Sequence, residues 1–442
     1  MSDYDRGQII MADIIEVSDK LKSLIAKKGD MKAQYTVALT QTREITMENG
    51  EFTLFRTLFD NHVSIEVIKD KKHGTTKLNK FDDKSLEAAL DDVLLSAQAG
   101  SEDEFFDIAP GMEPAQFHLG AENPDVDKLM QRAREFSDDI AKRHPKILVM
   151  QIILKHVSAH SIYRNTNGSQ DEKISGYYEV VVEFAGNDGT NSTGIAGTQV
   201  VTDNLDMPFI ELGSIEKDLQ DAENSLNPVT VEGKFDGKVI FTPACAVQMI
   251  YYALSNFAGE SAVLDGTGLW LGKVGEKVAA DKLTIAMKPW DERIVNHEVH
   301  TDDGFRSEDY TIIENGVLKS YMTSLYAANK CKVERAKNSG FDIVVEGGDI
   351  AFSDMVKGIK RGLIVGAVSC GTPSGNGELS GVAKNSFYVE DGQIKGAVTE
   401  TMINFNLADM MQNVTALSKE VLCDGTMVVP YIEVEHILIS GK

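Results

Sequence analysis

Apolar residues recur every three or four positions in several stretches of the chain. In the first stretch they stand at Ile10, Ile14, Val17, Leu21 and Leu24. One face of an α-helix has this period, so the stretch predicts a helix over residues 8–28. The same period predicts helices over residues 84–97, 125–143, 214–226 and 242–256.

Stretches rich in β-branched and aromatic residues lie between the helices of the first half and predict strands. Asn49-Gly50 separates two of them and is a strong hairpin-turn signal. Asp83 is the expected N-cap of the helix at 84–97, with Gly100 beyond its end. Residues 100–123 are expected to form a linker. The predicted strands are 31–40, 42–47, 51–58, 63–69, 147–154 and 177–184.

Pro228 marks a change in the pattern. From Val229 onward, apart from the helix at 242–256, the chain consists of short strand-like runs with turn signals between them. Asn315-Gly316 and Asp391-Gly392 each predict a β-hairpin. Short helices are expected at 353–359 and 407–416, and a last strand at 431–439.

These elements predict an α+β fold. We expect an N-terminal α/β sandwich region, with helices on an antiparallel sheet, followed by a large, mostly antiparallel, β-rich C-terminal domain. The expected division is an N-terminal α+β domain at 1–110, a middle α+β segment at 111–228 that packs with it, and the β-rich domain at 229–442.

The composition adds a strong negative charge. The 442 residues include 68 Asp and Glu against 44 Lys and Arg, which gives a net charge of −24. Proteins that bind nucleic acid usually carry a basic patch that faces the phosphates. We therefore expect no direct contact with nucleic acid.

The chain has no apolar run of membrane-spanning length, and its N-terminus, MSDYDRGQII, lacks the basic start of a secretory signal. Cys245, Cys331, Cys370 and Cys423 are far apart and form no C-x-x-C pair, which favours reduced thiols. We expect a cytoplasmic protein that does not associate with membranes.

Two histidine patterns invite a metal-site interpretation. The segment His297–His300, HEVH, is similar to the zinc-peptidase motif H-E-x-x-H, but its histidines are three rather than four apart and its flanks predict a strand and a turn. Residues three apart on a strand point to opposite faces. His156 and His160 share a face of a predicted strand but lie roughly 13 Å apart, too far to ligate one ion. We expect structural residues at both places.

Cys370 lies in the glycine-rich stretch SCGTPSGNGELSG, which is expected to be a loop. A reactive thiol needs a base or a positive neighbour, and the sequence places neither beside it. A hydrolase that pairs Cys370 or Cys423 with a histidine such as His436 stays open as an alternative, although no spacing supports such a dyad.

Five segments stand in an order that is more informative than any single motif. They are Ser96–Gly111, Gly259–Ala280, His300–Lys330, Asn404–Glu420 and the terminal Ile439–Gly441. From about residue 31 to the C-terminus, the chain resembles the TldD/PmbA family. This resemblance implies an N-terminal α+β region, a β-rich C-terminal domain and a chain that dimerises.

The resemblance also implies two kinds of chain. The TldD kind is a zinc metallopeptidase whose helix carries H-E-x-x-x-H, and a cysteine near its C-terminus completes the site. The PmbA kind, also called TldE, lacks the motif and partners the first kind in degrading or maturing peptides. Matching residues 242–256 to the zinc helix places Tyr251 and Tyr252 at the first His and the Glu, and Asn256 at the second His.

Neither tyrosine nor asparagine is a normal zinc ligand, and Cys423, near the family's cysteine position, cannot hold a catalytic zinc alone. We therefore expect a PmbA/TldE-like chain with no catalytic residue, metal ligand or cofactor of its own, and zinc in its partner. Glu260, Ser261 and Cys423 are candidates for a cleft or an interface.

The expected function is that of a subunit in a cytoplasmic metallopeptidase complex acting on unfolded peptides, enzymatically incomplete by itself. Its partner would be a TldD-like zinc peptidase subunit or a second copy of the chain. The alternative is a regulatory binding protein that acts through protein contacts, in line with the family's older label, modulator of DNA gyrase.

Overall fold

The N-terminal sheet is built from long strands in which more buried and less buried residues alternate over part of their length. The computed structural model describes residues 3–442, with side chains from Ile14 onward. The strands of this sheet are β1 (Lys32–Glu48), β2 (Glu51–Lys69), β3 (Lys72–Leu78), β4 (Ala115–Gly120), β5 (Ile147–Asn165), β6 (Gln170–Gly186) and β7 (Ala196–Thr202).

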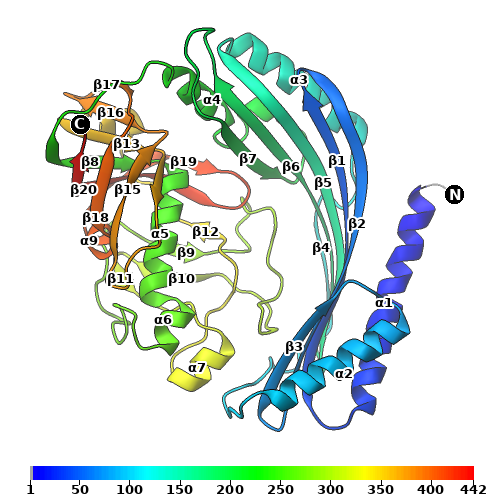
Figure 1. Ribbon diagram of the computed structural model, residues 1–442. Helices are drawn as coiled ribbons and strands as arrows, with labels where there is room; N and C mark the ends of the chain where they lie inside the picture. Colours follow the sequence, from blue (N-terminus) through cyan, green and yellow to red (C-terminus); the bar gives the residue numbers. More distant parts are fainter. Residues whose placement is uncertain (1–2) are drawn as a thin grey trace.

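The strand order is β3-β2-β1-β5-β6-β4, with β7 also paired to β6. β4 and β6 are parallel, and the other neighbours are antiparallel. Figure 1 shows the sheet as a long curved wall, with the C-terminal half of the chain on its concave side. Contacts between the two halves form on this concave face, as between Lys173 and His297, and also at its ends, as between Asp103 and Lys330.

Helices cover the outer side of the sheet in two groups. Leu21 and Leu90 of the first two helices pack with Val37 and Val63 of β1 and β2. Phe136 and Leu219 join a second cluster farther along the sheet. The helical segments are α1 (Asp3–Lys27), α2 (Asp83–Ala99), α3 (Val126–Arg143), the 3₁₀ turn η1 (Phe209–Glu211) and α4 (Ile215–Asn224).

Several predicted boundaries need correction. Residues 31–47 do not break into two strands, because β1 continues through Glu48, and β5 runs eleven residues past the predicted end at Leu154. The expected linker at 100–123 contains β4, which pairs with β6. The N-cap of α2 is Asp82 rather than Asp83, since its Oδ1 accepts the Ser85 N–H at 3.0 Å.

The second sheet holds 13 strands from residues 234–440 and is mostly antiparallel. β8 is parallel to β13, and β12 is parallel to β20. The predicted hairpins at Asn315-Gly316 and Asp391-Gly392 are confirmed. The strands are β8 (Lys234–Phe241), β9 (Ile285–Met287), β10 (Tyr310–Glu314), β11 (Val317–Leu318), β12 (Ile343–Val344), β13 (Arg361–Val365), β14 (Ala367–Cys370), β15 (Glu378–Lys384), β16 (Phe387–Glu390), β17 (Gln393–Ala397), β18 (Met402–Asn406), β19 (Val414–Cys423) and β20 (Val428–Ser440).

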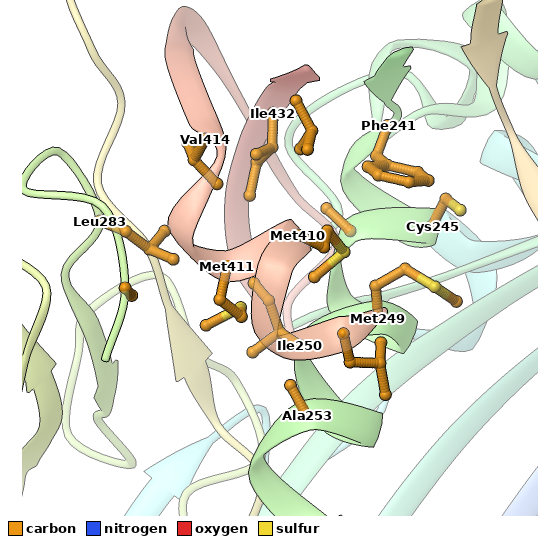
Figure 2. Packing of buried hydrophobic residues seen from close by; sticks show 14 of the residues in the cluster. Phe241, Cys245, Met249, Ile250, Ala253, Leu283, Met410, Met411, Val414 and Ile432 are labelled. Atoms are coloured by element: carbon orange, nitrogen blue, oxygen red, sulfur yellow. The ribbon is translucent and has the colours of Figure 1, made fainter. Parts of the chain in front are cut away.

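The C-terminal core surrounds one helix. Figure 2 shows Met249 and Ile250 of this helix against Met410 and Met411, with Ile432 of β20 nearby. The predicted helix at 407–416 is shorter than expected, because it ends at Gln412 and Val414 already begins β19. The helices are α5 (Pro243–Ala258), α6 (Glu260–Leu264), α7 (Leu325–Cys331), α8 (Phe352–Lys357) and α9 (Leu407–Gln412).

The predicted α+β class, with its β-rich C-terminal part, is thus confirmed. Residues 1–110 and 111–228 both contribute strands to the first sheet, while residues 229–442 form the second. The three-part division itself stays a prediction. Within the described part of the chain, every helix is too short or too polar to cross a membrane.

Candidate functional site

Helix α5 is fixed by signals at its start and by one apolar face. Thr242 is the N-cap, with Oγ1 3.5 Å from the Cys245 N–H, and Pro243 occupies the first turn, where no N–H is needed. Ala253, Leu254 and Phe257 are fully buried. The helix therefore presents only its opposite face, which carries Tyr251, to its surroundings.

The three residues predicted to replace the zinc motif each have a structural contact. Tyr251 is 48% exposed, and its ring meets Phe341 edge-on with centroids 5.1 Å apart. The hydroxyl of the half-buried Tyr252 accepts a 3.4 Å hydrogen bond from Gln248. Asn256 donates to the carbonyl oxygen of Ser374 at 3.1 Å. All three side chains thus serve packing or local hydrogen bonding around α5.

Cys370 closes strand β14, so the predicted loop begins after it rather than around it. Burial raises the pKa of the Cys370 thiol, and a hydrogen bond with Tyr252 offsets this only in part. The thiol, not the thiolate, is the favoured form, and a thiol is a poor nucleophile.

Cys423 belongs to a different part of the C-terminal domain. It packs with Ile294, Val344 and Val428, and its Sγ lies 3.3 Å from the carbonyl oxygen of Arg293. Burial raises the pKa of this thiol as well. His436 pairs instead with Asp236 at 3.4 Å. The contacts of these residues do not assemble a cysteine–histidine dyad.

Glu260 and Ser261, the other predicted cleft residues, begin α6. Glu260 Oε2 accepts the backbone N–H of Ser324 at 2.6 Å, just before α7, and the residue lines a cavity between the two halves of the molecule. Ser261 is exposed. The structure brings Glu260, but not Tyr251, Asn256 or Cys423, to this cavity.

A polar cleft lies between the N-terminal sheet and the C-terminal domain. It consists of cavities of about 740 and 520 Å³ that share Glu66, Thr75, Asp302 and Gly340 in their walls. In the larger cavity, one wall comes from β1, β2, β3, β5 and β6, and the other from residues 296–302, Gly340 and Asp342. The charged residues and histidines lining the larger cavity are His62, Glu66, Lys77, Lys173, His297, Glu298, His300, Asp302 and Asp342.

Burial shifts the pKa values of several ionisable groups inside this cleft. Burial, with the nearby Glu298, raises the pKa of Asp342 to about 6. Burial also raises the pKa of Glu298, although the N–H groups of Ser339 and Gly340 oppose the shift. Burial lowers the pKa of Lys173, whose Nζ donates to the His297 carbonyl oxygen at 2.8 Å. One cavity thus contains two carboxyl groups with raised pKa values, Asp342 and Glu298, and a lysine with a lowered pKa, Lys173.

An ion-pair cluster holds the C-terminal wall against the sheet. The side chain of Asp171, on β6, is fully buried and accepts from Arg306 at 2.7 and 2.8 Å and from His300 at 2.8 Å. Burial would raise the pKa of Asp171, but these hydrogen bonds outweigh it and hold the pKa well below its usual range. We call Asp171, His300 and Arg306 the latch.

The segment His297–His300 is not the predicted strand. Its backbone is irregular, and its single β-bridge joins His300 to Arg306. Its two histidines have separate partners: His297 Nδ1 lies 2.5 Å from the carbonyl oxygen of Pro289, and His300 belongs to the latch. The predicted strand conformation of this segment is therefore wrong, and the expectation that its histidines are structural residues stays a prediction.

His156 and His160 also have separate partners. His156 Nε2 lies 2.7 Å from the carbonyl oxygen of Ala121, while His160 Nε2 lies 2.7 Å from Glu172. Both stand on β5, as predicted. Among residues 14–442, whose side chains the structure describes, no three His, Cys, Asp or Glu side chains form a group suited to a metal ion.

Sequence reasoning missed Asp171, Lys173 and Asp342. Each is separated from its partners in the other half of the chain by more than a hundred residues, and none lies in a recognisable motif. Asp171 lies before the predicted strand at 177–184, in the part of β6 that was not predicted, and its partners follow only from the tertiary fold.

Comparison with known proteins gives a consistent result. A model described as PmbA/TldA metallopeptidase domain 1 matches residues 39–97, and one described as PmbA/TldA metallopeptidase C-terminal domain matches residues 233–441. A metalloprotease of Methanocaldococcus jannaschii is 23% identical over 91% of this chain and 92% of its own. A PmbA homologue of Haemophilus influenzae, also named a metalloprotease, is 23% identical over 90% of this chain and 88% of its own.

Solved structures share the fold. TldE from Thermococcus kodakarensis superposes with a TM-score of 0.83 at 20% identity, over 96% of this chain and 100% of that one. A protein of Thermotoga maritima, described as a candidate modulator of a DNA gyrase, gives a TM-score of 0.79 at 21% identity, over 96% of this chain and 99% of that one. Together with the two domain models, these likenesses show that the chain belongs to the TldD/PmbA family.

Proposed function

We propose that this chain is a PmbA/TldE-like subunit of a cytoplasmic metallopeptidase complex that degrades or matures unfolded peptides. It bears no catalytic zinc. A TldD-like partner subunit supplies the metal and the hydrolysis, and this chain supplies peptide-binding surface.

The observation that carries the proposal is the set of residues on α5. In a family named for metallopeptidases, Tyr251 packs on Phe341, Tyr252 bonds to Gln248 and Asn256 bonds to Ser374. None of the three is a normal zinc ligand. A tyrosine hydroxyl is also a poor replacement for a carboxylate base.

The interdomain cleft supports the peptide-binding part of the proposal. Its larger cavity is of the size that holds a few residues of an extended chain, and its walls carry both Lys173 and Asp342. A peptide offers carbonyl oxygens, N–H groups and two charged ends, all of which such walls can bind. An extended peptide can also pair with strand edges near the cleft.

Purification from the source cells under native conditions tests the assignment. We expect a second chain bearing H-E-x-x-x-H to co-purify with this one, and zinc to follow that second chain when the two are separated. Stoichiometric zinc on this chain, together with full peptidase activity in its isolated form, would reject the proposal.

A second candidate is a regulatory binding protein without a peptidase partner. The description of the Thermotoga maritima structure favours it. The net charge of −24 opposes direct contact with DNA, so the target would be a protein. A pull-down that recovers a topoisomerase and no zinc-bearing chain would support this candidate over the first.

A further inference from the structure

Residues 101–107 form a loop between the two halves of the molecule, and we call this loop the strap. It follows α2 and has the sequence SEDEFFD. The nearest buried residues on either side are Ala97 and Ile108, which are 1% and 3% exposed, whereas all seven strap residues are exposed or half-buried. The strap is therefore anchored in the core at both ends but not between them.

The strap contacts helix α7 of the C-terminal half. Asp103 accepts hydrogen bonds from the Tyr326 hydroxyl at 2.9 Å and from Lys330 Nζ at 2.8 Å. The Phe106 ring stacks on the Tyr326 ring with centroids 4.6 Å apart. Figure 1 shows α7 at the same end of the molecule as α2 and β3. The contact thus joins the two halves at one end of the cleft.

This contact is weaker than the latch. The side chains of Asp103 and Lys330 are 19% and 42% exposed, and ion pairs at a protein surface contribute little to stability. Each apolar cluster formed by residues 14–442 lies wholly in one half of the chain, so the contact adds no shared core. The Asp171 side chain of the latch, in contrast, is fully buried. The strap should therefore leave α7 while the latch stays closed.

The smaller cavity of the cleft lies directly behind the contact. Phe106 and Asp107 of the strap belong to its wall, as do Leu325 and Tyr326 of α7. Separating the strap from α7 would therefore open this cavity at its end without any movement of the latch.

We propose that the strap and α7 form a gate that opens and closes one end of the cleft. The strap is the moving part, because Ala327 and Ala328, which are 0% and 8% exposed, hold α7 in the C-terminal half. The open gate admits an extended chain, and the closed gate retains it. That the chain is an unfolded peptide rests on the proposed function, whereas the opening itself does not.

Cysteine labelling of the full chain tests the opening without a peptidase assay. Ala336 lines the smaller cavity and is 5% exposed, so A336C should react with a maleimide when the gate is open. Adding D103A removes the hydrogen bonds to α7 but leaves the cavity wall intact, since Asp103 lies outside it. We expect the labelling rate at residue 336, measured by mass spectrometry, to rise roughly fivefold.

Two controls separate gate opening from other changes. E104A alters the same strap, but Glu104 pairs with Lys71 of its own half, so the labelling rate should stay unchanged. The native Cys245 is 1% exposed in the C-terminal core and reports unfolding of that domain; its rate should also stay unchanged. M322C, at a half-buried position of the same cavity wall, repeats the measurement independently of A336C.

Two outcomes would overturn the proposal. One is an equal labelling rate with and without D103A at both reporter positions. The other is a rate that rises equally at Cys245, because the domain would then unfold rather than the gate open. A faster rate at the reporters alone supports the gate, even if this chain and a zinc-bearing partner together cleave no peptide, a result that would reject only the proposed function.

Discussion

Asp171 illustrates how single buried residues position the cleft. It stands on β6 of the N-terminal sheet, and its carboxylate receives both Arg306 and His300 from an irregular segment of the C-terminal domain. In the same segment Gly304 has a positive φ of 86°, and a Cβ there would lie 2.0 Å from the Tyr163 hydroxyl oxygen. The latch and this close approach together fix one wall of the cleft.

The variant D171N should destabilise the protein by about 3 kcal/mol at pH 7, because Arg306 and His300 lose a charged partner in a buried site. The pKa of Asp171 is depressed in the folded state, so its stabilisation is present above the unfolded pKa of about 3.9 and is lost as the pH falls through the folded value. Urea unfolding of both proteins should show this difference at pH 7 and at pH 5, and the difference should narrow in stronger acid, as Asp171 of the wild-type protein is protonated.

The matched control for D171N is D354N, because Asp354 is 60% exposed and pairs with the similarly exposed Lys357. Such surface pairs contribute only about 0–1 kcal/mol. Equal effects of the two variants would contradict the role assigned to the latch.

For Asp342 we predict the opposite pH dependence of the free energy of unfolding. Its pKa of about 6 in the folded protein lies above the ordinary 3.8, so its ionisation weakens the fold as the pH rises between these values. D342N should therefore stabilise the protein by about 2 kcal/mol at pH 7, a figure reduced for partial solvent access, and by almost nothing at a pH of about 3.5. Unfolding midpoints measured at the two pH values check this; a gain that is independent of pH would contradict it.

At the scale of elements, helix α5 is an example of an element that local sequence signals predict. Its apolar spacing, its N-cap Thr242 and Pro243 predict the helix to within two residues. The hairpins at Asn315-Gly316 and Asp391-Gly392 were equally predictable, because their turns need particular residues. Local rules thus recover the elements whose signals are local.

Elements set by distant contacts were not predictable in this way. The apolar run at Leu407–Met411 continues into Val414, and only pairing with β20 converts the rest of the predicted helix into β19. β4 looked like a linker because its strand character comes from β6. The latch and Lys173 depend on the same kind of contact, so no spacing rule could assemble the cleft.

The two faces of α5 predict different costs of truncation. I250A should destabilise the protein by about 2–5 kcal/mol, because Ile250 is only 2% exposed and its removal leaves a cavity against α9. Y251A, one position along the same helix, should cost about 1 kcal/mol, since Tyr251 is half exposed and loses one aromatic contact. Chemical denaturation checks both, and similar costs would contradict the assigned faces.

At the scale of the whole molecule, residues of the curved sheet and of the C-terminal domain together line a cleft that neither could form alone. The loop between β2 and β3, residues 100–110 and α7 close one end, where Phe106 stacks on Tyr326 with centroids 4.6 Å apart and Asp103 pairs with Lys330. In the proposed complex, this cleft binds part of the peptide.

Filling the cleft should therefore weaken peptide cleavage by the complex. Ser64 on β2 lines the larger cavity, and S64W is expected to lower the kcat/KM of the paired enzyme roughly tenfold, because the indole takes up space needed by the peptide. The control T190W lies on the exposed loop before β7 and should have no effect. If S64W folds normally and its kcat/KM is unchanged, the cleft does not bind the peptide.

The most direct test of the proposed function is reconstitution. Cleavage of an unfolded peptide is measured with this chain alone, with a zinc-bearing TldD-like chain alone and with the two mixed, with zinc quantified in each sample. We predict cleavage by the pair only, with the zinc bound to the partner. Full cleavage by this chain alone, with one zinc per chain, would contradict it.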